Sequence, residues 1–421
     1  MMNLSSFGQK ISIGSGIGQL MEDLGAALSQ RSDMLMLGGG NPAHIPAVQK
    51  YFRSSMEKLL ANGTEFERAI GDYDPPSGNR QFIKAICELL RKQLHWDIQP
   101  KNIALTNGSQ SAFFILFNIF AGTFDDGSVK KILFPLAPEY IGYCDVGLVD
   151  DLFIANRPKI EHIDDRIFKY HIDFDRLNIT DQIGAICVSR PTNPTGYVLT
   201  DSEIQKLTDL ACANDVPLII DNAYGAPFPG IIFTDVKAVW NEHTIFCMSL
   251  SKLGLPAART GIIIASEEVT SWISKVNAVM SLAPCSMGAA ITTDLVRSGQ
   301  IIDLSRNIIR PFYQQKAQTA LELVCKELDG VNFHVHKPEG AFFLWLWFPD
   351  LPITSRELYL RLKDRGVLIV PGHYFFPGLK EDWPHKNECI RVNYSQDPET
   401  VTAGIKIIAQ EVKKAYKINS S

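Results

Sequence analysis

The sequence has 421 residues, of which 46% are hydrophobic, and carries a formal net charge of −5 at pH 7. This length accommodates two or three ordinary domains with sizeable cores. The 41 Lys and Arg residues are spread along the chain, so they form no basic patch of the kind that follows the phosphates of nucleic acid, and we expect small molecules as partners.

The N-terminus and the apolar runs predict a cytoplasmic protein with no membrane span. The start, Met1-Met2-Asn3, has no charged segment followed by an apolar run and a cleavage site. The longest apolar run, 112–121, is interrupted by Asn118 and is shorter than the roughly 20 residues that cross a bilayer. The 8 cysteines are dispersed without a CxxC pair, so we expect neither a disulfide framework nor a metal site.

Apolar runs rich in β-branched residues alternate with helical periodicity through the middle of the chain. This alternation is typical of an α/β fold with a mostly parallel sheet covered by helices. Two helices have clear starts, at Asn107-Gly108-Ser109 before 110–120 and at a capping box of Thr200 and Glu203 before 204–214. The predicted strands are Asn102–Thr106, Lys131–Phe134, Ala185–Ser189, Pro217–Asp221, Thr244–Ser249 and Gly261–Ala265.

The pattern changes after Arg310-Pro311. One long helix reaches about Leu328, separated strands follow, and a final helix spans Glu399–Tyr416. This part predicts a smaller α+β domain. We therefore expect an N-terminal arm with part of the small domain (1–50), a large domain (51–310) and a small C-terminal domain (311–421). The strands of the last part are predicted at Phe342–Phe348, Val367–Val370 and Cys389–Asn393.

Lys252 follows the strand Thr244–Ser249 directly, in the segment Ser249-Leu250-Ser251-Lys252. Ligands of open α/β sheets bind outside the carboxyl ends of the strands, so the ε-amine would face a cleft there. A partly desolvated lysine amine can form a Schiff base with an aldehyde. Taken alone, the segment is more typical of an ordinary solvated loop lysine.

Two other predicted strands also end in polar side chains. Asp221 ends the strand that starts at Pro217, and Tyr224 follows three residues later. A carboxylate at this place can keep a pyridine nitrogen protonated, and the tyrosine can donate to a phenolate oxygen on the same ring. The Pro/Gly turn 191–196 can direct Asn193 to that oxygen. A helix cap, a packing tyrosine and a plain β-turn are the alternatives.

The segment Thr106-Asn107-Gly108-Ser109-Gln110 places free N–H groups at a helix start that follows a strand. Such a helix start binds anions well. A phosphate there would also be within reach of Ser249 and Arg259. The alternatives are a routine helix start and a surface arginine.

Two more candidates come from the remaining strand ends. Tyr140, within Pro138–Tyr143, can stack on an aromatic ring, although a core or interface role is also open. Arg391 lies within the predicted strand Cys389–Asn393, and its guanidinium fork suits bidentate capture of a carboxylate. A structural salt bridge is the alternative for Arg391.

In their order along the chain, these residues resemble the class I aminotransferases, which are fold-type I enzymes that use pyridoxal 5'-phosphate (PLP). The resemblance runs from Leu37-Gly38-Gly39-Gly40-Asn41-Pro42 to Arg391-Val392-Asn393. It implies a large domain that binds PLP through Lys252 and a smaller α+β domain. It also implies that Tyr73, in Tyr73-Asp74-Pro75, reaches the phosphate in a partner subunit, so that the active unit is a homodimer.

The resemblance implies a role for every other candidate. Arg391 clamps the substrate carboxylate with help from Asn193 and a backbone contact at Gly40. Asp221 pairs with the pyridine nitrogen, and Tyr224 and Asn193 bind the phenolate oxygen. Tyr140 stacks on the ring. The residues implied to hold the phosphate are Ser109, Gln110, Ser249 and Arg259.

The implied activity is the transfer of an amino group between amino acids and 2-oxo acids. Ser15-Gly16-Ile17 and Pro371-Gly372-His373 resemble members of the family that pass the amino group of valine to pyruvate. A broader alanine-forming or aromatic aminotransferase and a PLP lyase stay open. A PLP-sensing transcription regulator needs a DNA-binding module, for which we expect no room before Leu37. The apolar residues Ile17, Leu20 and Met21 are expected to fold over the site as a lid.

Overall fold

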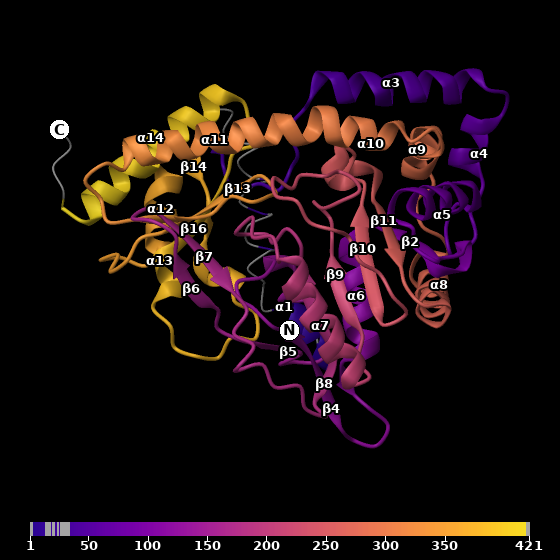
Figure 1. Cartoon of the computed structure of the whole chain (residues 1–421), viewed down its shortest axis with the longest axis horizontal. Coiled ribbons are helices and arrows are strands. Elements are labelled where there is room, and N and C mark those ends of the chain that lie inside the picture. The colour runs from indigo at the N-terminus through magenta and orange to yellow at the C-terminus, as the bar shows by residue number, and fades with distance from the viewer. Residues whose placement is uncertain (1–2, 13–17, 19–21, 23–24, 26–33, 418–421) are drawn as a thin grey trace.

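The computed structural model describes residues 3–12, 18, 22, 25 and 34–417. The predicted lid residues Ile17, Leu20 and Met21 lie outside this range. Figure 1 shows two sheets beside each other, with the long helix α11 (Arg310–Glu327) running along both parts of the molecule. No helix of the described residues is long and apolar enough to cross a membrane.

The central sheet has eight strands in the order β2-β11-β10-β9-β8-β4-β3, with β5 beside β4. It is mostly parallel, as predicted. Its long strands are buried over most of their length, so each appears in the sequence as a run of β-branched and other apolar residues. All six predicted strands are present. Their bounds are β2 Ile103–Asn107, β3 Gly122–Thr123, β4 Val129–Phe134, β5 Phe153–Ala155, β8 Ile183–Ser189, β9 Leu218–Asp221, β10 Thr244–Ser249 and β11 Thr260–Ile264.

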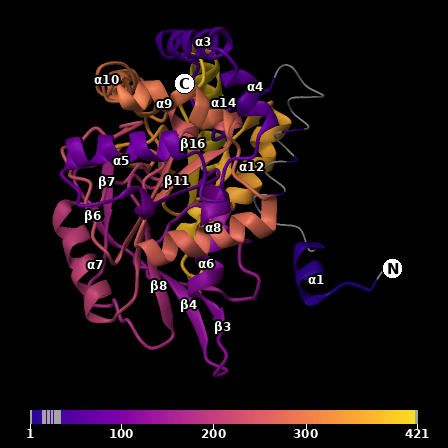
Figure 2. The ribbon, with the colours of Figure 1, turned by 90° about the vertical axis from the view of Figure 1, so that its right-hand side faces the viewer.

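Helices cover both faces of this sheet. Figure 2 shows α7 (Asp201–Ala213) on one side and α6 (Ser109–Phe120) and α8 (Glu267–Ser281) on the other. The predicted capping box of α7 is present, since Thr200 Oγ1 accepts from Glu203 N and Glu203 Oε2 accepts from Thr200 N. The other helices of this part of the molecule are α3 Pro46–Ala61, α4 Glu65–Gly71, α5 Arg80–Leu94 and α9 Met287–Arg297.

The second sheet has six strands in the order β15-β16-β13-β12-β7-β6. Two of them, β6 and β7, come from the segment that the sequence assigned to the large domain, and β7 pairs with β12 in parallel. The division of the chain at residue 311 stays a prediction. The strands are β6 Lys159–His162, β7 Ile167–His171, β12 His334–His336, β13 Phe343–Trp347, β15 Val370–Pro371 and β16 Cys389–Asn393.

The predicted strand Val367–Val370 is wrong as a single element. Its first half, β14 (Val367–Leu368), pairs with β1 (Leu35–Met36) in a separate two-stranded sheet. Its second half pairs with β16 instead, so the chain changes sheets at Ile369. An apolar run does not reveal such a change, because both halves are buried.

The predicted long helix is present as α11, close to its predicted bounds, but the helical segments before it were not predicted. α10 (Gln300–Leu304) and a π-helical segment, Ser305–Ile309, lead directly into α11. α11 packs against the last helix, α14 (Pro398–Ala415), close to the predicted bounds. The remaining helices are α1 Ser6–Ser12, α12 Ser355–Asp364 and α13 His385–Glu388.

Candidate active site

A cavity of about 520 Å³ lies where the carboxyl ends of β8, β9 and β10 meet. A larger groove of about 790 Å³, lined by residues of α5 and α8, contains none of the predicted site residues. All of those residues except Tyr73 line the 520 Å³ cavity. They are Gly40, Ser109, Gln110, Tyr140, Asn193, Asp221, Tyr224, Ser249, Lys252, Arg259 and Arg391.

Lys252 lies in a short 3-10 turn, Ser251–Leu253, directly after β10. Its Nζ donates to Gly40 O at 2.7 Å and lies 5.4 Å from the centre of the Tyr224 ring. Burial, together with the charge of Arg391, lowers the pKa of Lys252 to about 8. A larger share of the amine is therefore neutral near pH 7, and the neutral amine is the form that attacks an aldehyde.

Asp221 ends β9 beside the lysine strand. Its Oδ2 accepts from Tyr143 Oη at 2.6 Å and its Oδ1 accepts from Ala223 N at 3.0 Å. Burial raises the pKa of Asp221, while these hydrogen bonds and the charge of Lys252 oppose that rise. The carboxyl forms no ion pair within the described part of the chain, which leaves it suited to a cationic ligand group.

Tyr143 is a site residue that sequence reasoning missed. Tyr140, three residues earlier, is the predicted stacking residue, and its ring lies 5.3 Å from the Tyr143 ring at an interplanar angle of 88°. No spacing in the sequence indicated this role, because Asp221 lies 78 positions further along the chain. Gly142 allows this approach, since a Cβ there would lie 2.3 Å from the Tyr140 ring.

Arg391 is a buried cation with no acidic partner in the part of the chain that the structure describes. Arg391 belongs to β16, and only 2% of the residue is exposed. Its Cζ lies 4.2 Å from the centre of the Phe343 ring. Nη1 donates to Asn193 Oδ1 at 2.7 Å and Nη2 to Gly38 O at 2.5 Å, whereas Nε has no partner among residues 3–12, 18, 22, 25 and 34–417. Burial lowers the pKa of Arg391 to about 10.

The structural salt bridge that the sequence left open for Arg391 has no acid to form it among the described residues. Burying a guanidinium without a compensating acid destabilises the folded protein, so a role in ligand binding explains its presence better than a role in folding. A substrate carboxylate, which can take two N–H donors of the fork, supplies that reason.

A second polar corner forms at the start of α6. Gly108 has φ +83° there, and a Cβ on it would lie 2.1 Å from Arg259 Nη2, so only glycine lets the guanidinium approach the helix start. Arg259 donates hydrogen bonds from Nη1 to Pro256 O and from Nη2 to Asn107 O. The Ser249 hydroxyl lies in the same cavity, where free helix N–H groups favour an anion.

The remaining candidates occupy the cavity wall. Gln110 Nε2 donates to Gly142 O at 2.7 Å and so joins the helix start to the turn that carries Tyr140. Tyr224 is buried edge-on against Phe342. Burial raises the pKa of both tyrosines, so their hydroxyl groups remain protonated donors.

Tyr73 is not part of this cavity within one chain. It is 80% exposed and lines a different groove together with Ser286 and Arg297 of the α9 region. The loop before α9 reaches back to the anion corner, because Cys285 N donates to Asn107 Oδ1 at 2.8 Å. No group of three His, Cys, Asp or Glu side chains within the described residues has the arrangement of a metal site.

Comparisons with known proteins show the family of the chain. The family model of aminotransferase class I and II matches residues 54–408. The valine–pyruvate aminotransferase of Escherichia coli is 52% identical over 415 residues, which cover 99% of each chain.

Solved structures give the same result. A putative amino-acid aminotransferase from Psychrobacter arcticum matches with a TM-score of 0.97 and 46% identity over 100% of both chains. The valine–pyruvate aminotransferase of Salmonella typhimurium matches with a TM-score of 0.88 and 51% identity, covering 96% of this chain and 100% of that one. These agreements confirm the predicted fold-type I fold, and the chain belongs to the class I and II aminotransferases.

Proposed function

We propose that this PLP-dependent aminotransferase transfers the amino group of L-valine to pyruvate and releases 3-methyl-2-oxobutanoate and L-alanine. The observation that carries the proposal is the cavity in which the low-pKa amine of Lys252 and the acid-free guanidinium of Arg391 converge. The relatives that share half of the sequence are named for these two substrates.

The residues of the cavity fit the cofactor of the family. When bound, PLP supplies an electron-withdrawing ring that stabilises negative charge at the α-carbon of an amino acid. The anion corner of Ser109, Gln110, Ser249 and Arg259 suits its phosphate. We assign Asp221 to the ring nitrogen, since this buried carboxyl has a neutral donor, Tyr143, and no cation of its own.

The protein groups divide the remaining work by position. We assign Arg391 to the substrate carboxylate, with Asn193 holding the guanidinium at Nη1. The Lys252 amine, with its pKa near 8, is poised to accept the proton that leaves the substrate α-carbon and would pass it on within the same half-reaction. In the second half-reaction it would supply a proton to the α-carbon of the product amino acid. Tyr140 and Tyr224 are assigned to the ring face and the phenolate oxygen.

The charge of the wall favours an apolar substrate side chain. The cavity holds three cations among the described residues, Lys252, Arg259 and Arg391, and each already has a task in the proposal. A substrate with a second carboxylate would find no further cation there. Apolar groups of Met36, Phe113 and Ile141 line the same space. Since one methylene is worth only about 1–3 kcal/mol, the choice of valine draws its support from the relatives.

A homodimer with composite sites is part of this proposal. Tyr73 is exposed, and so are the apolar side chains of Ile70, Val279, Met280 and Leu282. Tyr73 and the α9 region share one groove, and the loop between α8 and α9 contacts the anion corner through Asn107. A second copy that covered this apolar surface would bring its Tyr73 toward the phosphate. The cytoplasmic location stays a prediction.

A visible spectrum of the purified protein tests the substrates. We expect valine to bleach the cofactor band and pyruvate to restore it, with alanine as the product of the second step. Recovery of ammonia in place of alanine would indicate a lyase. A band that responds to phenylalanine and not to valine would replace this proposal with the aromatic alternative.

A further inference from the structure

One wall of the cavity is formed by residues 38–41. Together with Leu37 they make a strip, Leu37–Asn41, whose carbonyl groups are all engaged by donors from distant parts of the chain. Asn393 N donates to Leu37 O at 2.8 Å, and Arg391 Nη2 donates to Gly38 O at 2.5 Å. The other three bonds run from Asn393 Nδ2 to Gly39 O at 2.6 Å, from Lys252 Nζ to Gly40 O at 2.7 Å, and from Ser395 Oγ to Asn41 O at 2.8 Å.

These donors are of two kinds. Arg391 and Lys252 are the groups that the proposed function gives to the substrate carboxylate and to the cofactor, so their bonds to the strip compete with ligand binding. Asn393 and Ser395 are buried, carry no charge and have no ligand assigned. Ser395 N donates to Asn393 Oδ1 at 2.5 Å, which fixes the Asn393 amide with its Nδ2 toward Gly39.

The middle of the strip, Gly38–Gly40, depends most on hydrogen bonds from other parts of the chain to keep one conformation. It consists of three successive glycines, whose backbones lose the most conformational freedom on ordering. Once Arg391 and Lys252 turn to their ligands, the Asn393 amide is the one side-chain donor left on residues 38–40 within the described structure. The N–H groups of Gly39 and Gly40 have no partner among the described residues and are available to a carboxylate held by Arg391.

We propose that Asn393 is a positioning residue of the aminotransferase. Its amide holds the glycine strip in place while Arg391 and Lys252 exchange their bonds to the strip for bonds to substrate and cofactor, and Ser395 supports it at Asn41. This inference rests on the proposed function, because it takes Arg391 as the carboxylate clamp. Asn393 lies two residues beyond Arg391 on β16, so both side chains leave the same face of the strand.

The test compares Asn393→Ala with Asn102→Ala in the PLP-loaded enzyme. Asn102 is a matched control, since it is also buried and both ends of its amide bond the backbone, at Ala265 O and Gln99 N, far from the cavity. The probe is 3-methylbutanoate, which is valine without its amino group. Binding is measured by calorimetry and stability by thermal unfolding.

We expect Asn393→Ala to weaken 3-methylbutanoate binding about tenfold, equivalent to about 1.4 kcal/mol. The KM for valine should rise by a similar factor while kcat changes by less than about threefold, because the strip contacts the carboxylate in ground and transition states alike. Asn102→Ala should lower the melting temperature and leave binding unchanged. Unchanged binding in Asn393→Ala would overturn the proposal.

A second variant covers a failure of Asn393→Ala to fold. Ser395→Ala removes one hydroxyl at the end of the strip, and we expect about threefold weaker binding of the probe. Binding equal to that of the wild type in this variant would also count against the role. If the wild type bound 3-methylbutanoate but did not transaminate valine, and Asn393→Ala still weakened this binding, the proposed function would be refuted and the positioning role would stand.

Discussion

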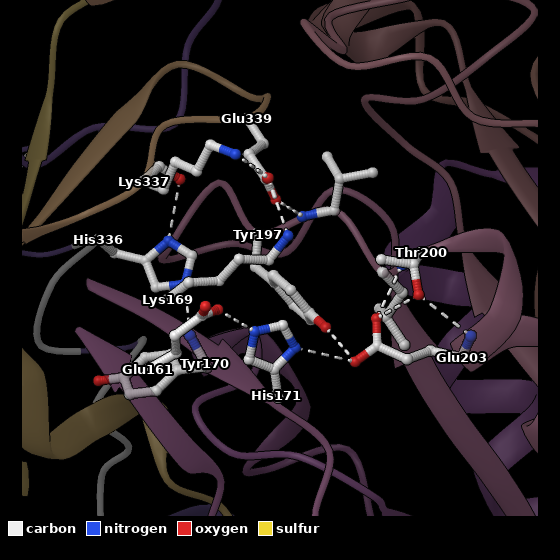
Figure 3. Close-up of polar contacts among 12 residues, drawn as sticks. Glu161, Lys169, Tyr170, His171, Tyr197, Thr200, Glu203, His336, Lys337 and Glu339 are labelled. Carbon is white, nitrogen blue, oxygen red and sulfur yellow. Dashed lines mark hydrogen bonds and ion pairs between the residues drawn. The ribbon is translucent and has the colours of Figure 1, made fainter. Parts of the chain in front are cut away.

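Two buried groups of charged side chains, on adjacent parts of the molecule, are built in opposite ways. At the cavity, Arg391 is buried, and no acid of the described chain lies beside it. In the second group, drawn in Figure 3, Lys169 of β7 lies 2.8 Å from Glu339, and both side chains are almost fully buried. Glu339 also accepts from the N–H of Val198, a residue that follows β8 of the central sheet.

The rest of the second group follows the same rule of pairing. Tyr197 donates to Glu203 Oε1 at 2.6 Å, and His171 lies between Glu203 and Glu161 (Figure 3). These contacts join β7 of the second sheet to α7 and the loop before it. In the second group, charged side chains are paired and join the two sheets. At the cavity, the cation Arg391 has no acidic partner among the described residues. Four predictions separate these two kinds of charge.

The largest effect is expected at the cavity lysine. Lys252→Ala should abolish transamination and the visible band of the bound cofactor, because no other amine in the cavity can replace it. Its melting temperature without added cofactor should not fall, since the variant removes a desolvated amine that forms no ion pair. Normal turnover by this variant would contradict the assignment of the site.

The second effect concerns the acid-free guanidinium. Arg391→Gln should lower kcat/KM for valine by roughly 10³-fold, since it removes a charge-assisted fork from the carboxylate. Stability should stay the same or rise, because an uncompensated buried charge is removed. Steady-state kinetics and thermal unfolding on one preparation test both halves, and a large loss of stability would show that Arg391 is structural.

The matched change in the paired group should have the reverse outcome. Glu339→Gln leaves Lys169 buried beside a neutral amide, and we expect the free energy of unfolding to fall by about 3–5 kcal/mol. The folded variant should retain the KM of the wild type, since neither side chain lines the cavity. Denaturant unfolding provides the measurement. A variant as stable as the wild type would remove the distinction between the two groups.

The smallest effect is a shift in pH dependence. Because the neutral amine reacts with the aldehyde and the folded pKa of Lys252 lies near 8, the rate of cofactor attachment should rise with pH and level off above about 8. The charge of Arg391 contributes to this lowering, so the midpoint should move upward in Arg391→Gln. Stopped-flow absorbance gives the midpoint, and one near the ordinary lysine pKa would exclude a desolvated Lys252.

The features that could be predicted from the sequence are those that depend on residues close to one another along the chain. Six of the eight strands of the central sheet were predicted, because they are buried over most of their length and each appears as an apolar run. The short strands β3 and β5 were missed. β6 was missed because its residues, Lys159 to His162, are largely exposed and polar. The strand-end residues were predictable for a related reason, since Lys252 and Asp221 directly follow or end such runs.

Residues that act through distant partners left no comparable signal. Tyr143 reaches Asp221 across 78 positions, and Asn393 reaches Gly39 across 354. Neither contact follows from spacing, because each depends on how separate strands are placed in the fold. The sequence could show Arg391 as an unusual charge in a strand, but only the packed structure shows that no acid accompanies it.

The most direct test of this account is to fix the cofactor to the protein chemically. Borohydride treatment of the coloured holoenzyme, followed by peptide mass mapping, should find the pyridoxyl group on Lys252 and on no other lysine. A colourless preparation without any adduct, or an adduct on another residue, would contradict the central claim that Lys252 holds the cofactor in this cavity.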